Sequence, residues 1–125
     1  MARVIHFEIP TTDVEAAKKF YSNVFGWEFS SYPIEQGEDY WMIMTGKQGT
    51  PGIDGGFYRP DGKLSGTVNT IDVENIDTAI AKVKANGGSV VYPKAHLEGV
   101  GWLAYVKDPS GVLFGMMQSD PNSRM

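Results

Sequence analysis

A chain of 125 residues with 42% hydrophobic residues is the size of one ordinary globular domain. Its formal net charge is −4 with both signs interspersed, which argues against a nucleic-acid partner, and its lack of cysteine excludes disulfides, thiolate chemistry and cysteine-bound zinc. No apolar run approaches the ~20 residues of a membrane span, and no signal peptide is visible. We therefore expect a soluble, cytoplasmic protein with no membrane partner.

The first predicted strand, Val4–Pro10, alternates between apolar and polar side chains. Side chains on a strand point to opposite faces with a period of two. One face of this strand is therefore suited to a core. The other face carries the imidazole of His6 and the carboxylate of Glu8 side by side.

A helix is expected next, because apolar residues recur at helical spacing up to Gly26. Thr12 with Glu15 fits a capping box, and Asp13 is a rival N-cap. A turn is expected at Pro33 and Gly37. The remaining elements of the first half are three short strands near 27–29, 40–44 and 55–58.

The same order of elements then starts again. The second half predicts a strand at 68–73, a helix from Asn75 to Gly87, and strands at 90–92, 102–106 and 112–117. The two copies are offset by about sixty residues, which is the mark of an internal repeat. Four pairs of landmarks align across the copies: Asp13 with Asn75, Gly26 with Gly88, Trp41 with Trp102, and Gly56 with Gly115.

This organisation predicts an α+β fold of two β-α-β-β-β modules. We expect a single domain over 1–125, with module one at about 3–60, module two at about 66–118, and a flexible tail at 119–125. Each half-sheet has one face covered by its helix. Pairing two such half-sheets predicts a curved mixed sheet with helices outside and a concave pocket inside.

The sequence resembles the vicinal oxygen chelate superfamily, which includes glyoxalase I, bleomycin-resistance proteins and extradiol dioxygenases. The resemblance covers the chain from Val4 to about Gln118. It is carried by these features: His6 before Asp13, Phe20-Tyr21 and Val24-Phe25-Gly26 in the first helix, Gly87-Gly88 after the second, and Asp108-Pro109-Ser110-Gly111 before the last strand. The resemblance implies paired β-α-β-β-β modules, often assembled as a homodimer.

The resemblance also implies where a metal would bind. Metal enzymes of the family hold one divalent ion with four side chains, from the first and last strands of each module. Here those positions fall on His6, Gly56, Val68 and Gly115. Valine has no donor, and the glycines offer only backbone atoms, so His6 is the one retained ligand. We expect no metal site and no cofactor, and a divalent ion stays an open alternative.

Three roles are open to His6: a leftover ligand, a general acid or base, or a pocket histidine satisfied by a neighbour. Glu8 is its nearest candidate partner, either in a catalytic pair or in a packed polar bridge. His96 is expected on an exposed loop. Seven further residues are predicted to line the pocket: Trp41, Tyr58, Val68, Thr70, Trp102, Gly115 and Met117.

These observations predict a protein that binds a small organic molecule in a concave pocket without the family's full metal site. One alternative is a metal-dependent or acid–base enzyme of the glyoxalase, epimerase or dioxygenase type, using His6 and Glu8. Another is a non-catalytic sequestering or interaction module. Whether the chain is an enzyme is left open, and the expected partners are a small-molecule ligand and a second copy of the chain.

Overall fold

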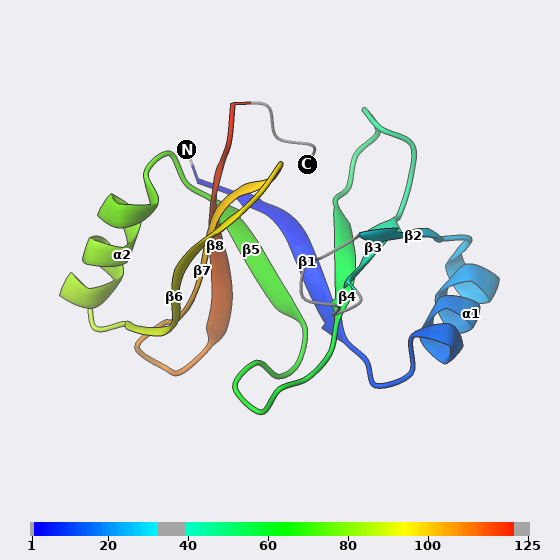
Figure 1. The fold of residues 1–125 in the computed structure, drawn as a ribbon, viewed down its shortest axis with the longest axis horizontal. Helices are drawn as coiled ribbons and strands as arrows, with labels where there is room; N and C mark the ends of the chain where they lie inside the picture. Colours follow the sequence, from blue (N-terminus) through cyan, green and yellow to red (C-terminus); the bar gives the residue numbers. More distant parts are fainter. Residues whose placement is uncertain (1, 33–39, 122–125) are drawn as a thin grey trace. The chain divides into compact units, whose positions relative to one another are not determined.

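The computed structural model describes residues 2–32 and 40–121, so the turn predicted at Pro33 and Gly37 lies outside the described residues. The chain forms two compact units, His6–Thr67 and Met1–Ile5 with Val68–Met125. The elements, labelled in Figure 1, are β1 (Val4–Pro10), α1 (Val14–Phe25), β2 (Glu28–Tyr32), β3 (Tyr40–Met44), β4 (Asp54–Tyr58), β5 (Val68–Asp72), α2 (Ile76–Ala85), β6 (Ser89–Leu97), β7 (Gly101–Lys107) and β8 (Leu113–Ser119).

The predicted α+β fold of two β-α-β-β-β modules is confirmed. In the His6–Thr67 unit, β2 pairs antiparallel with β3, β3 antiparallel with β4, and β4 parallel with β1. In the Val68–Met125 unit, β6 pairs antiparallel with β7, β7 antiparallel with β8, and β8 parallel with β5. The same pairing scheme in both units is what a duplicated module requires.

Each helix starts at a side-chain cap. Asp13 is the N-cap of α1, because its carboxylate accepts a hydrogen bond of 3.0 Å from the Ala16 amide. Asp13 rather than Thr12 therefore starts the helix. Asn75 caps α2 in the same way, at 3.0 Å from the Thr78 amide. The left-handed backbone of Gly26, with φ of 74°, ends α1.

The register separates the two faces of the first sheet. Glu8 is paired with Gly56, and Gly56 with Met42, so these residues and His6 share one face. Phe57 lies on the opposite face, where its ring contacts Tyr21 of α1 with centroids 6.0 Å apart. The helix and its aromatic packing therefore occupy one face, and His6 and Glu8 lie on the other, as the alternation predicted.

The second sheet is sided in the same way. Gln118 faces α2, because its side-chain oxygen accepts a hydrogen bond of 2.9 Å from the Ile76 amide. Gly115 and Gln118 are an odd number of positions apart in β8, so their side chains point to opposite faces. Thr70 is paired with Gly115, and Thr70 and Gly115 therefore lie on the face away from α2. The core of this unit includes the buried residues Val68, Ile76, Ala104, Val106, Met116 and Met117.

Three predictions in the second half were wrong. Strand β6 does not stop at Pro93 but continues to Leu97, which is possible because β6 lies at the edge of its sheet. His96 is therefore in a strand and not on a loop, and it is exposed as predicted. Its imidazole lies 2.8 Å from the Asp120 carboxylate, and the Asp120 amide donates to the Val100 carbonyl, so the predicted tail is held at least to Asp120.

The alignment of Trp41 with Trp102 was also wrong. Phe57 follows the aligned Gly56 and pairs with Trp41, whereas Met116 follows the aligned Gly115 and pairs with Ala104. Trp41 therefore corresponds to Ala104, two positions from Trp102. A shift of two residues preserves the face of a strand, so both tryptophans lie on the helix-facing side of their own unit.

Candidate functional site

His6 is hydrogen-bonded to a residue that the sequence did not single out. Its Nε2 atom lies 2.9 Å from the hydroxyl of Tyr40, at the start of β3. Both side chains lie on the face away from α1. His6 and Glu8 are each 5% exposed, so this face buries two ionisable groups where an ordinary core would have apolar side chains.

The Tyr40 ring occupies the space above Gly56. A Cβ atom added to Gly56 would collide with the hydroxyl and ring carbons of Tyr40. Residue 56 is the position at which the resemblance implies a carboxylate ligand. Gly56 and Tyr40 therefore depend on each other, because the phenol of Tyr40 fills the space that a side chain at position 56 would occupy. Tyr40 is two residues before Met42 in β3 and therefore shares its face, and this alternation is the sequence signal that could have revealed the contact with Gly56.

Burial and charge both keep the His6–Tyr40 pair neutral. Burial lowers the pKa of His6 to about 4, and the nearby Asp54 carboxylate opposes this shift only in part. Burial also raises the pKa of Tyr40 well above its ordinary value, and the negative charge of Glu8 adds to that shift. At neutral pH a neutral imidazole therefore meets a neutral phenol.

The residues present do not fit the divalent metal that the resemblance implies. In the first unit, Nε2 of His6 is engaged by Tyr40, and Gly56 has no room for a carboxylate. In the second unit, Val68 has no donor atom, and a Cβ at Gly115 would lie 2.9 Å from Oγ1 of Thr70 and 3.3 Å from the Tyr105 ring. Within 2–32 and 40–121, no group of three His, Asp or Glu side chains could hold a metal ion.

The structure divides the predicted pocket residues between faces. Tyr58 shares the face of His6, and its hydroxyl donates to the Gly66 carbonyl at 2.8 Å. Burial raises the pKa of Tyr58, with Glu8 contributing. Trp41 is not brought together with His6, because it lies on the α1 face, where the Lys18 ammonium sits 3.8 Å from its ring centroid.

In the second unit, the predicted pocket residues Val68, Thr70, Gly115 and Met117 share the face away from α2. Trp102 lies on the other face, with its ring centroid 4.9 Å from that of His96. Thr70 is 1% exposed, and its hydroxyl has no hydrogen-bond partner among the described residues. A buried hydroxyl without a partner is uncommon and costs stability.

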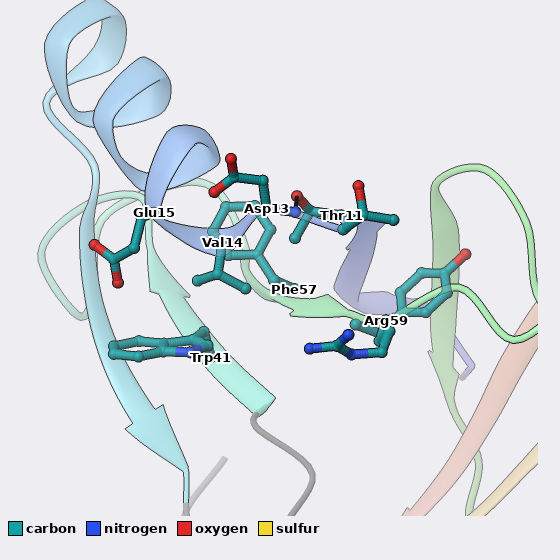
Figure 2. A pocket seen from close by; sticks show the side chains of 9 residues that line it. Thr11, Asp13, Val14, Glu15, Trp41, Phe57 and Arg59 are labelled. Atoms are coloured by element: carbon teal, nitrogen blue, oxygen red, sulfur yellow. Dashed lines mark hydrogen bonds between the residues drawn. The ribbon is translucent and has the colours of Figure 1, made fainter.

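A cleft with a volume of about 260 Å³ lies on the α1 face of the first unit (Figure 2). Its lining residues are Thr11, Thr12, Asp13, Val14, Glu15, Trp41, Phe57, Tyr58 and Arg59. Trp41 and Tyr58 were predicted for the concave pocket with His6 and not for this cleft, and Arg59, which follows β4 directly, was not predicted at all. The alternation of β4 places Arg59 on the same face as Phe57 and would have identified it.

Comparison with known proteins finds similarity to bleomycin resistance protein-like and glyoxylase-like proteins. A family model described as bleomycin resistance protein-like N-terminal matches residues 3–46. CFP32 of Mycobacterium tuberculosis, a glyoxylase by name, is 31% identical over 118 residues, which are 90% of this chain and 44% of that protein. A glyoxylase-like domain-containing protein of Didymella fabae is 35% identical over 89 residues, 65% of each chain.

Among solved structures, methylmalonyl-CoA epimerase in complex with methylmalonyl-CoA and NH4+ superposes with a TM-score of 0.72 over 98% of both chains, at 18% identity. Fold and relatives together define a glyoxalase-like α+β protein built from two modules. The chain is similar to these proteins, and the comparisons agree with the resemblance of its sequence to the vicinal oxygen chelate superfamily. It spans less than half of the length of the mycobacterial relative. Neither described helix is long and apolar enough to cross a membrane.

Proposed function

We propose that this protein binds a small organic molecule on the sheet face that carries His6, Glu8 and Tyr40, without a divalent metal. The observation that carries the proposal is the bond between His6 Nε2 and the Tyr40 hydroxyl, with the Tyr40 ring in the space above Gly56. Where the resemblance implies metal ligands, this unit has a pair of neutral hydrogen-bonding groups, the imidazole of His6 and the hydroxyl of Tyr40. Such groups orient a ligand in an otherwise apolar site.

The same pair is poorly suited to acid–base catalysis at neutral pH. A general base works best when its pKa lies near the working pH. The pKa of His6, about 4, makes it a weak base, and the raised pKa of Tyr40 makes it a weak acid. These two pKa shifts favour a binding protein over the acid–base enzyme that His6 and Glu8 suggested. Catalysis of the kind implied by the relatives' names would need other groups.

The metal-free part of the proposal is tested by elemental analysis of the purified protein after growth with zinc, nickel and manganese. We expect far less than one metal ion per chain and no rise in melting temperature on adding these ions. Stoichiometric metal would contradict the proposal. A double substitution, Tyr40→Ala with Gly56→Glu, releases His6 and adds a carboxylate beside it, so it should bind these ions more tightly than the wild type does.

The binding part is tested by ligand-observed NMR with a fragment library that includes methylmalonyl-CoA, the ligand of the structural relative. Compounds that bind should be weakened by Tyr40→Phe, which removes the hydroxyl and keeps the ring. Tyr21→Phe is the matched control, since Tyr21 lies on the α1 face against Trp27. Ligands that bind both variants equally would place the binding site elsewhere.

A further inference from the structure

The cleft of Figure 2 lies where two parallel strands end. Strands β1 and β4 run parallel and finish at Pro10 and Tyr58, and the Thr11 amide donates to the Tyr58 carbonyl at 2.9 Å. The chain then leaves β1 for α1 and leaves β4 through Arg59. Ligands of sheets with parallel strands often bind at the carboxyl ends of those strands, where such connections converge. Trp41 and Phe57 of the cleft are on the opposite face from His6, and none of His6, Glu8 and Tyr40 lines it, so it is a separate location.

Three charged side chains line the cleft: Asp13, Glu15 and Arg59. Asp13 is engaged by the Ala16 amide at 3.0 Å, and Glu15 pairs with Lys18 at 3.3 Å. Arg59 has no ion pair or hydrogen bond among the described residues. Its guanidinium points toward the side of the cleft that holds the Trp41 ring (Figure 2). Arg59 is therefore the one lining charge that a ligand can pair with directly.

The apolar part of the cleft is flat and aromatic. Trp41 is partly exposed and forms one wall, while Phe57, only 1% exposed, is anchored in the packing under α1. The Lys18 ammonium, which pairs with Glu15, lies 3.8 Å from the centroid of the Trp41 ring. A volume of about 260 Å³ falls below the ~300 Å³ at which pockets for drug-sized ligands begin, which favours a smaller molecule.

We propose that this cleft is a second binding site, for a small organic anion with a planar body. The acid group, a carboxylate or a phosphate, pairs with the Arg59 guanidinium, whose planar fork binds both groups through two parallel hydrogen bonds. The planar body lies against Trp41. The site does not depend on the proposed role of the His6 face.

The test uses the full chain labelled with ¹⁵N and three probes: benzoate, phenyl phosphate and uncharged benzyl alcohol. We expect benzoate or phenyl phosphate to shift the Trp41 indole N–H resonance with a saturable, millimolar or tighter affinity. Benzyl alcohol should bind at least tenfold more weakly. The stronger of the two anionic probes identifies the acid group. Arg59 is exposed, so Arg59→Gln should leave the fold intact and weaken the anion at least tenfold.

Two controls make the result decisive. Arg59→Lys keeps the charge and removes the fork, and should weaken binding by less than Arg59→Gln does. Lys47→Gln removes an exposed cation outside the cleft and should leave the affinity unchanged. The proposal is overturned if Arg59→Gln binds the anions as tightly as the wild type. It is equally overturned if benzyl alcohol binds as well as benzoate, or if no probe shifts the Trp41 resonance.

Discussion

Replacing Thr70 by valine should stabilise the protein. Thr70 is 1% exposed, and its hydroxyl has no hydrogen-bond partner among the described residues. Burying a hydroxyl without a partner costs about 1–3 kcal/mol. Valine has nearly the same shape and the same β-branched preference for a strand, so it removes this cost without leaving a void. We expect a gain of about 1 kcal/mol in the free energy of unfolding, at the lower end of that range.

Urea denaturation followed by circular dichroism measures this difference directly. A gain of about 1 kcal/mol corresponds to a rise in melting temperature of roughly 4 °C for a domain of this size. Thr70→Ser is the matched control, because it keeps the hydroxyl and removes the methyl group. It should lower stability by about 1 kcal/mol. If Thr70→Val is instead less stable than the wild type by 1 kcal/mol or more, the hydroxyl is hydrogen-bonded in the folded protein and the reasoning fails.

Three further predictions follow from the described contacts. The pKa of His6 falls from 6.5 to about 4 on folding, so the folded state favours the neutral imidazole. The resulting stability is fully present above pH 6.5, and up to about 3 kcal/mol of it is lost as the pH falls from 6.5 to 4. The free energy of unfolding of the wild type should therefore fall more steeply over this range than that of His6→Gln. Gly56→Ala should cost about 1–3 kcal/mol in urea unfolding, and pairing it with Tyr40→Ala should cost less than the sum of the two single changes. Asp13→Ala should cost about 1 kcal/mol by thermal unfolding, and an unchanged stability would show that the cap carries no weight.

The parts of the fold that depend on local signals were predictable from the sequence. Alternation in β1 placed His6 and Glu8 on one face, and the register of β1 against β4 agrees. Helical spacing and capping residues located both helices, and Asn75 was identified as a cap. These features are encoded by near neighbours in the chain. A reader of the sequence needs only periodicity and the chemistry of helix ends to find them.

The contacts that define the candidate site could not be predicted in the same way. The bond between His6 and Tyr40 joins residues 34 positions apart, and it depends on the register of β3 against β4. The connecting loop does not fix that register. Trp41 and Trp102 were matched because they are the same residue type, although strand pairing shows that Trp41 corresponds to Ala104. Residue identity is a weaker guide to equivalence than pairing.

The contact between Tyr40 and Gly56 constrains how this chain could change over evolutionary time. Acquiring Glu at position 56 alone would drive its side chain into the Tyr40 ring, whereas losing Tyr40 alone would leave a glycine that offers no donor. A carboxylate at position 56 would therefore need both substitutions, and either single step should be less stable than the starting protein. Exchange of this pair for a carboxylate therefore passes through an unfavourable intermediate in either order.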